Sequence, residues 1–374
     1  MPLRSALLLG LLLCPVPPSA GRRSRKGRGS AHKTAAGAEQ QALRSFPGAL
    51  TDEQCDSLIA AAQREGKQFS GVTTFGLDSS RDSEIRWLPR EHPSVAAVHK
   101  RFAEHTRAAN HEWGWPLTRP ETKGLQFAHY EEPHGGYDWH VDAVPQRDRK
   151  MMGGQMVSRM VTLVAQLSTP DSYAGGDLQV GPVNASRERG TLHVFPSSMA
   201  HKVWPTTAGE RWSVVSWNGG VLDDAPDYFA TAIESYTRML ASAEAVATDE
   251  DGAAAAPTVE TVSHWKKLLA RTYTFVGKLD EAEAAYEAAT ALTPLDVAGF
   301  NNLGTCRVQQ GKHEEAIVPF ERALSLDPTG LQSLTNIGSI YMTAGRLEDG
   351  VEALERAVTL HAPAVSDQVR RRLP

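Results

Sequence analysis

The sequence has few cysteines and no apolar run long enough to cross a membrane, and these absences exclude several classes of protein. Cys14, Cys55 and Cys306 are too few among 374 residues for a disulfide framework or a multi-cysteine zinc module. The apolar run at residues 6–14 is far too short to span a bilayer as a helix. We therefore expect a globular protein with unpaired thiols and no stable transmembrane segment.

Acidic residues outnumber basic residues outside the first 38 positions. Residues 1–38 contain seven of the 39 lysines and arginines and no acid, so the remainder carries 32 basic against 44 acidic residues, a formal charge of −12. A body this acidic gives no reason to expect nucleic-acid binding. The length allows about two to three domains, and the apolar fraction is ordinary for globular cores.

Residues 1–38 are predicted as a targeting leader. Arg4 precedes the apolar run and small residues follow at 18–20, which is the layout of a secretory signal peptide. The Arg-rich, acid-free stretch at residues 21–33 also fits an organellar transit peptide. We expect entry into the secretory pathway, with the endoplasmic reticulum lumen favoured and an organelle reached by a transit peptide as the alternative.

The C-terminal third contains an internal repeat of 34 residues. The positions that recur are Gly277, Gly311 and Gly345; Ala289, Ala323 and Ala357; and the bulky Tyr286, Phe320 and Leu354. This pattern resembles the tetratricopeptide repeat, a helix-turn-helix unit whose small residues let its two helices approach. The match covers about residues 263–364 in three copies. It predicts an α-helical solenoid, which generally offers a groove to a peptide or a partner protein.

The chain is predicted to comprise five segments. They are a leader at 1–38, a region of short β-patterned runs at 44–222, a helix and low-complexity linker at 223–258, the repeats at 259–364, and a tail at 365–374. The helix is expected to end near residue 240, because Ala241–Pro257 has no large apolar side chain and is typical of a linker.

His140, Asp142 and His201 are the candidate metal ligands. Tyr137–Val144 is predicted as one strand, on which His140 and Asp142 point to the same face because strand residues i and i+2 do so. His201 would complete a set of two histidines and one carboxylate, which leaves coordination positions open and suits non-haem Fe(II) oxygenases. Arg211, ten residues further on, offers a planar fork that can clamp the carboxylate of a keto-acid cosubstrate.

The region around these residues predicts a jelly-roll-like β-fold. Residues 126–130, 159–168, 190–196 and 211–217 are patterned as short strands separated by Gly and Pro turns. The last of them alternates so that Arg211, Ser213, Val215 and Trp217 share one face.

Three stretches carry a resemblance to a known family. They are LQFAHYEEPHGGYDWHVDAV, TLVAQLSTPDSYAGGDLQV and GTLHVFPSSMAHKVWPTTAGERWSVVSW. In this order they are similar to 2-oxoglutarate, Fe(II)-dependent dioxygenases of the prolyl/lysyl hydroxylase type (prolyl 4-hydroxylase alpha-subunit-like), over about residues 46–220. The resemblance implies an α+β fold built on a double-stranded β-helix, or jelly roll. It also implies Fe(II), 2-oxoglutarate, O₂ and L-ascorbate as cofactors or cosubstrates, with succinate and CO₂ as co-products.

The resemblance also implies roles for individual residues. His140, Asp142 and His201 match the iron ligands, and Arg211, Tyr130 and Thr162 match positions at or beneath the 2-oxoglutarate pocket. His140, Asp142, His201 and Arg211 are therefore the predicted catalytic set. Members of the family often have an aromatic residue where this chain has Gln166, whose amide could still donate a hydrogen bond.

Three functions remain open at this point. The first expectation is hydroxylation of a protein or peptide, foremost at prolyl residues, with the substrate held in the groove of the repeats. The alternatives are hydroxylation of a small molecule, and an interaction scaffold whose oxygenase-like domain is inactive. His193, on a predicted strand before His201, is expected to be a packed side chain rather than a ligand.

Overall fold

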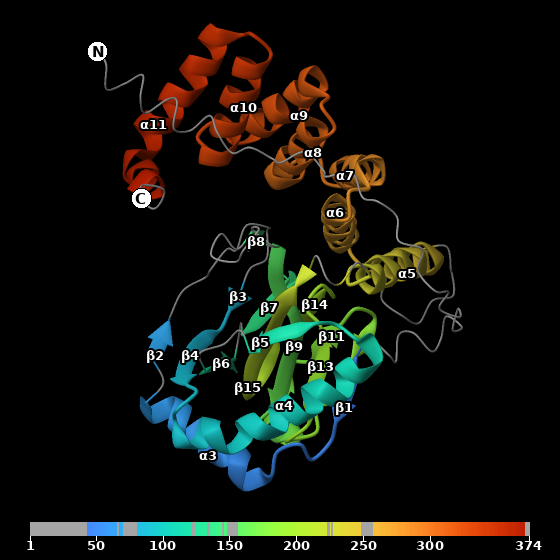
Figure 1. Ribbon diagram of the computed structural model, residues 1–374, viewed down its shortest axis with the longest axis vertical. Coiled ribbons are helices and arrows are strands. Elements are labelled where there is room, and N and C mark those ends of the chain that lie inside the picture. Colours follow the sequence, from blue (N-terminus) through green and yellow to red (C-terminus); the bar gives the residue numbers. More distant parts are fainter. Residues whose placement is uncertain are drawn as a thin grey trace. The chain divides into compact units, whose positions relative to one another are not determined.

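The computed structural model describes residues 43–65, 67–69, 81–120, 124–132, 135–143, 146–147, 156–222, 225, 227–247 and 257–370 (Figure 1). These residues fall into two compact units, one ending at Ala245 and the other beginning at Val246. The predicted leader lies outside the described residues, so its targeting role and the compartment stay predictions. None of the described helices combines the length and the apolar character that crossing a membrane requires.

The first unit, which we call the sheet unit, is built on two antiparallel sheets. The larger sheet has the order β1 (Arg44–Phe46), β13 (Leu192–Pro196), β9 (Met156–Gln166), β15 (Thr206–Val221), β6 (Gly124–Glu131), β4 (Glu84–Pro89), β2 (Lys67–Phe69), with β5 (Leu117–Pro120) and β10 (Tyr173–Gly175) paired to β15 and β8 (Gln146–Arg147) to β9. The smaller sheet has the order β12 (Val183–Asn184), β11 (Leu178–Val180), β14 (His201–Val203), β7 (Gly136–His140), β3 (Arg81–Asp82). The predicted jelly roll is confirmed.

Side chains alternate between the two faces of the larger sheet and so separate a core from a cavity. On β15, Trp212 and Val214 join an apolar core with Leu163 of β9 and Phe127 of β6. The intervening residues of the same strands face the smaller sheet and line a cavity. The predicted alternation on the strand that carries Arg211 is therefore confirmed, within a strand longer than the predicted one.

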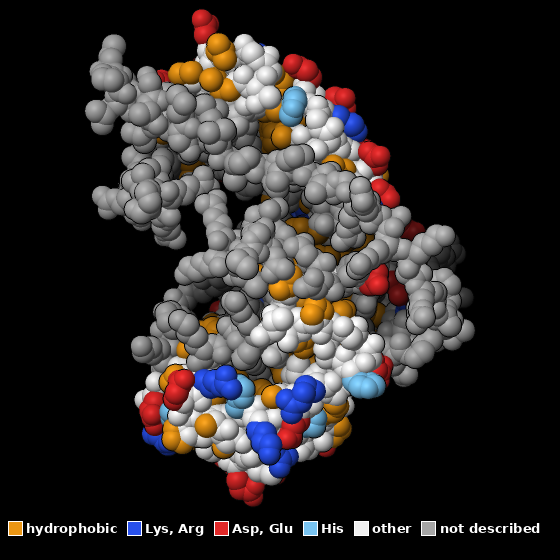
Figure 2. All heavy atoms as spheres, in the orientation of Figure 1, with side chains coloured by type: hydrophobic (Ala, Val, Ile, Leu, Met, Phe, Trp, Pro, Cys, Tyr) orange, Lys and Arg blue, Asp and Glu red, His pale blue; other side chains and the backbone are white. Residues whose placement is uncertain are grey.

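Helices α3 (Asp52–Glu65) and α4 (Pro93–Trp113) cover the core face of the larger sheet (Figure 1). The α4 helix begins with Pro93 in its first turn, where the ring costs no hydrogen bond, and ends at Gly114 with a φ of 67°. Its residues Val95, Val98 and Phe102 are buried in the core. The opposite side of the helix is charged, and acidic and basic side chains mix over this face of the molecule in Figure 2.

The strand that carries His140 is shorter than predicted. Residues Tyr137–Val144 were expected to form one strand, but β7 ends at His140 and Asp142 lies beyond it. The backbone N–H groups of Asp142 and Ala143 both donate to the carbonyl oxygen of Ser197, at 3.0 and 2.8 Å. Because these bonds replace the ladder to β14, the chain leaves the sheet directly after His140.

The helix after the sheets is displaced from its predicted position. It was expected over residues 223–240, whereas α5 covers Ala230–Ala247 and continues into the stretch predicted as linker. Alanine and glutamate favour helix, so the low-complexity composition that indicated a linker also extends the helix. Tyr236 of α5 is buried and donates to the carbonyl oxygen of Ser198 at 2.9 Å, which fixes the turn between β13 and β14.

The second unit, which we call the repeat unit, is a stack of helix pairs. The helices are α6 (Val259–Phe275), α7 (Leu279–Leu292), α8 (Val297–Gln309), α9 (His313–Leu326), α10 (Leu331–Thr343) and α11 (Leu347–Arg370). Gly277, Gly311 and Gly345 all have φ between 77° and 80°, a left-handed conformation that reverses the chain inside each pair. The recurrence of this turn agrees with the predicted period.

A substitution at Gly304 would test how closely the two helices of one repeat pack. A Cβ atom placed on Gly304 would lie 2.6 Å from the ring of Phe320, although alanine favours helix over glycine by about 1 kcal/mol. We expect Gly304→Ala to destabilise the repeat unit by about 1–3 kcal/mol, because overpacking outweighs propensity. Thermal unfolding followed by circular dichroism would measure this, with the exposed neighbour Thr305→Ala as control. A stabilised Gly304→Ala protein would contradict the close contact.

Candidate metal and cosubstrate site

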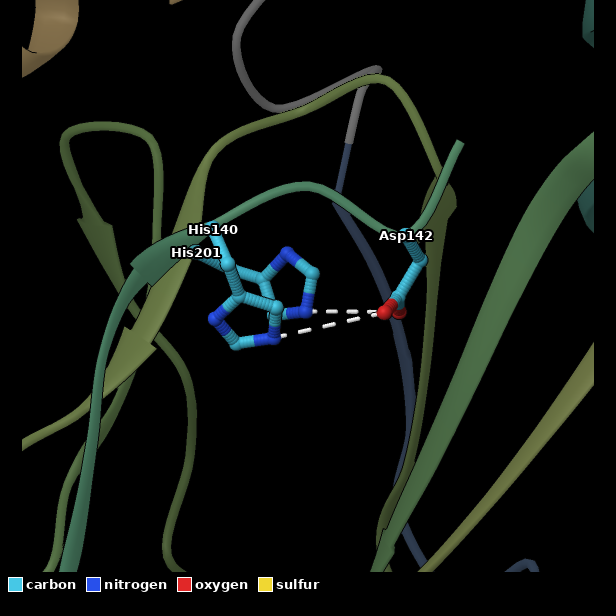
Figure 3. A group of neighbouring side chains, drawn as sticks. All are labelled: His140, Asp142 and His201. Carbon is cyan, nitrogen blue, oxygen red and sulfur yellow. Dashed lines mark ion pairs between the residues drawn. The ribbon is translucent and has the colours of Figure 1, made fainter. Parts of the chain in front are cut away.

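The structure brings His140, Asp142 and His201 together at one end of the cavity (Figure 3). His140 and His201 face each other as register partners in the antiparallel pair of β7 and β14. Nε2 of His201 lies 3.4 Å from Oδ2 of Asp142, and Nε2 of His140 lies 4.0 Å from Oδ1 of the same residue. The three potential ligand atoms all lie within 4.8 Å of one another.

Backbone hydrogen bonds fix the tautomer of both histidines. Nδ1 of His140 lies 2.7 Å from the carbonyl oxygen of Asp138, and Nδ1 of His201 lies 3.1 Å from the carbonyl oxygen of Met199. A carbonyl can only accept, so Nδ1 must carry the proton in each ring. In the neutral imidazole, Nε2 then carries the lone pair, as metal-binding histidines require.

Asp142 is held ionised and oriented by neutral donors. Its Oδ2 accepts from Oγ1 of Thr162 at 2.9 Å and from the indole Nε1 of Trp217 at 2.8 Å. Burial raises the pKa of the Asp142 carboxyl, but the positive charge that His201 and His140 carry when protonated, together with that of Arg159, outweighs burial, so the pKa lies well below its usual range. The carboxylate can therefore serve as an anionic ligand over the whole physiological pH range.

This donor set fits an Fe(II) ion. Two ligands of one ion lie at most about 4.4 Å apart when histidine and carboxylate bonds are about 2.0–2.2 Å long. The 3.4 and 4.0 Å separations between the histidine nitrogens and Asp142 fall below this limit. Two imidazoles and one carboxylate occupy three positions and leave others open, which is the arrangement of non-haem Fe(II) oxygenases.

Arg211 is a buried cation without an anionic partner in the described part of the chain. Its side chain is fully buried, and its Nη2 and Nη1 donate to the neutral oxygens of Gln166 and Ser213, at 2.8 and 3.4 Å. Its Nε has no hydrogen-bond partner among the described residues. A buried charge that lacks a counter-ion is costly, so this guanidinium fits a ligand carboxylate such as that of 2-oxoglutarate.

The cavity joins Arg211 to the three metal-binding residues. Its volume is about 400 Å³, and its wall includes Tyr130, Arg211 and Trp217. Tyr130 is the register partner of Arg211, whose guanidinium lies 5.3 Å from the tyrosine ring, so Tyr130 lies where its predicted role needs it. Thr162 does not reach the cavity wall: it is fully buried behind Asp142 and donates to it.

Two supporting residues could not be identified from the sequence. Trp217 was predicted only to share a strand face with Arg211, yet its indole N–H donates to Oδ2 of Asp142. Ser197 places Asp142 through its carbonyl oxygen, and its hydroxyl lies 2.8 Å from that of Thr162. A backbone acceptor can come from any residue type, so no sequence pattern could have identified Ser197.

His193 is a packed residue, as expected. It is fully buried, and its ring nitrogens contact the Ser45 hydroxyl and the Ser186 carbonyl at 2.9 Å each. Burial lowers the pKa of His193 from 6.5 to about 4, with a further contribution from the nearby Arg211.

This depressed pKa predicts acid sensitivity of the fold. The unfolded chain binds the proton near pH 6.5 and the folded chain only near pH 4, so stability falls by up to about 3 kcal/mol as pH drops through this window. We expect His193→Gln to flatten the dependence of the melting temperature on pH between 7 and 5. Parallel curves for the two proteins would show that other groups dominate.

The comparisons with known proteins agree with this geometry. Residues 125–219 match the model of the 2OG-Fe(II) oxygenase superfamily. A PKHD-type hydroxylase of Crocosphaera subtropica is 32% identical over 180 residues, which are 47% of this chain and 77% of that protein.

The chain belongs to the 2OG-Fe(II) oxygenase superfamily. Membership implies Fe(II) and 2-oxoglutarate, the two groups that fit the metal-binding residues and Arg211. Residues 268–330 and 331–361 match models of the tetratricopeptide repeat. The predicted combination of an oxygenase domain with C-terminal tetratricopeptide repeats is therefore confirmed.

Other relatives of this oxygenase match over shorter stretches or more distantly. A PKHD-type hydroxylase of Xanthomonas axonopodis pv. citri is 33% identical over 93 residues, 24% of this chain and 41% of that protein. The chain thus spans less than half the length of this relative. A solved prolyl-4-hydroxylase of Pseudomonas putida is 22% identical, with a TM-score of 0.36, over 49% of this chain and 96% of the other.

Proposed function

We propose that the protein is an Fe(II)- and 2-oxoglutarate-dependent dioxygenase that hydroxylates prolyl residues of a protein or peptide, with succinate and CO₂ as co-products. The observation that carries the proposal is one cavity lined by both a complete set of iron ligands and a buried, unpaired arginine. A scaffold with an inactive domain would have no use for an uncompensated buried cation, since its cost to stability is considerable.

His140, Asp142 and His201 would hold the metal. Bound iron supplies the activation of O₂ and, together with 2-oxoglutarate, the oxidising capacity to hydroxylate an unactivated C–H bond. The two imidazoles keep their lone pairs on Nε2 because their Nδ1 protons are committed to backbone carbonyls. Trp217 and Thr162 occupy Oδ2 of Asp142, which leaves Oδ1 as the freer oxygen of the carboxylate.

Arg211 would bind the carboxylate of 2-oxoglutarate that is remote from the metal. Its neutral partners Gln166 and Ser213 orient the guanidinium without neutralising it, so its full positive charge is available to the ligand. Because this side of the cavity is buried, the ion pair forms in a medium of low dielectric constant and is stronger than at the surface. Binding the cosubstrate there also fills space that water would otherwise occupy.

We extend the proposal to the repeat unit and to the cellular setting. Helical-pair repeats commonly bind peptides, so the repeat unit is proposed to bind the protein substrate. The oxygenase is proposed to act in the secretory pathway and to use ascorbate as reductant. The overpacked and destabilised Gly304→Ala protein would test the first point: turnover of a protein substrate should fall while 2-oxoglutarate binding is unchanged. Unchanged turnover of every protein substrate would contradict a role of the repeats.

Succinate formation from 2-oxoglutarate by the purified protein tests the proposed activity. The assay contains Fe(II) and ascorbate, with and without proline-containing peptides, and uses His140→Ala as control. We expect peptide-stimulated succinate that disappears in the control, together with a mass increase of one oxygen atom on the peptide. Turnover stimulated only by small molecules would favour the alternative substrate class, and no turnover despite iron and 2-oxoglutarate binding would contradict the proposal.

A further inference from the structure

Gln126 is a buried polar side chain in the cavity with no partner in the described part of the chain. It is 9% exposed and lines the cavity, and no hydrogen bond joins its amide to a described residue. Buried amides are normally hydrogen-bonded, and leaving one unpaired is costly. Within the described part of the chain, the Gln126 amide is therefore left for water or a bound molecule.

Gln126 lies some distance along the sheet from Arg211, the residue that would bind the cosubstrate carboxylate. On β6 it pairs in register with Val215 of β15 and Trp87 of β4. Tyr130, on the same strand and face, pairs with Arg211. Four residues of strand, roughly 13 Å, separate Gln126 from Tyr130. Gln126 thus lies toward the half of the cavity that contains Trp217 and Asp142.

The register neighbours of Gln126 are uncharged, although Arg159, whose guanidinium lies 4.1 Å from the centre of the Trp217 ring, also lines the cavity. Val215 and Trp87 flank it in register, and the Trp87 and Trp217 rings lie 6.2 Å apart. The indole N–H of Trp217 is already committed to Asp142. The Gln126 carboxamide can both donate and accept, so it is complementary to a peptide group, which offers one N–H and one carbonyl.

We propose that Gln126 is a specificity-determining residue, whose carboxamide hydrogen-bonds a peptide group of the substrate that flanks the hydroxylated prolyl residue. This inference rests on the proposed function and narrows it to substrates in which a peptide group follows the reacting residue. A site built around such a hydrogen bond discriminates against analogues that lack the amide, because the Gln126 carboxamide then loses its partner in the substrate.

The test compares the unsubstituted protein with Gln126→Leu, a change of similar size that removes the hydrogen bond. The probes are a proline-containing peptide that supports turnover, and its analogue in which the peptide N–H after the proline is replaced by an ester oxygen. We expect Gln126→Leu to lower kcat/KM for the peptide about 10-fold or more, the equivalent of one hydrogen bond. The ester should impair the unsubstituted protein similarly and the variant by less than about 2-fold.

Two measurements separate recognition from structural or cosubstrate effects. The 2-oxoglutarate Kd, measured by calorimetry with Mn(II) in place of iron, should be the same in both proteins, and the melting temperature of Gln126→Leu should be unchanged or higher because an unpaired polar group is removed. A weaker 2-oxoglutarate Kd, or unchanged peptide kinetics, would overturn the role of Gln126. Absence of peptide turnover by the unsubstituted protein would instead overturn the proposed function and this role with it.

Discussion

Replacing Asp142 with alanine is expected to abolish iron binding and turnover while leaving the fold intact. Asp142 is the only carboxylate among the described candidate ligands, and its Oδ1 and Oδ2 lie 4.0 and 3.4 Å from the two histidine nitrogens. Without it, two neutral imidazoles would face a divalent ion with no compensating charge. The loss in Fe(II) affinity should exceed the roughly 10–100-fold that removal of a supporting residue costs.

Equilibrium dialysis against Fe(II) or Mn(II) measures this loss directly, without relying on activity. Asp138→Asn is a matched control, because Asp138 lies two residues before His140 and its carboxylate is exposed and outside the ligand set. The control should bind metal normally, since only the Asp138 backbone carbonyl holds His140. Equal metal affinity of Asp142→Ala and the unsubstituted protein would refute the assignment of the ligands.

Replacing Arg211 with methionine is expected to weaken 2-oxoglutarate binding about 30- to 100-fold and to leave metal binding unchanged. The estimate corresponds to the loss of charge-assisted hydrogen bonds to one carboxylate. The variant tests cosubstrate binding separately from metal binding, because Arg211 makes no hydrogen bond or ion pair with the metal-binding residues. Calorimetry with Mn(II) measures both affinities, and the exposed Arg107→Met serves as control.

Gln166→Glu should also weaken 2-oxoglutarate binding. It does so by adding a negative charge beside Arg211 instead of removing the positive one. Oε1 of Gln166 already accepts from Arg211 at 2.8 Å, so a glutamate there would form a buried ion pair and repel the carboxylate of the ligand. Stability should be maintained or increased, because the guanidinium gains a counter-ion, whereas 2-oxoglutarate affinity falls. Normal affinity in this variant would mean that the cosubstrate carboxylate is bound elsewhere.

The sequence identified His140, Asp142, His201 and Arg211 by residue type and spacing, and the structure gathers them around one cavity. Arg211 lies on a strand whose alternation is visible in the sequence, and the glycines at 34-residue intervals mark turns that need a left-handed backbone conformation. The end of β7 at His140 could not be predicted, because it depends on hydrogen bonds to the carbonyl of Ser197, a distant backbone atom. The extent of α5 was missed because alanine-rich sequence suits both helix and linker.

The long strand β15 fixes the spacing of two side chains in the cavity wall, Arg211 and Trp217. Arg211 and Trp217 lie on one unbroken strand that is bonded on both edges, to β6 and to β9. The distance between Arg211 and Trp217, whose indole N–H donates to Asp142, therefore depends on one continuous strand and not on how a loop closes. A single residue inserted between them would turn Arg211 toward the helix-covered face. The spacing between the buried guanidinium of Arg211 and the indole N–H that donates to Asp142 is thus specified by the seven residues 211–217 of one strand.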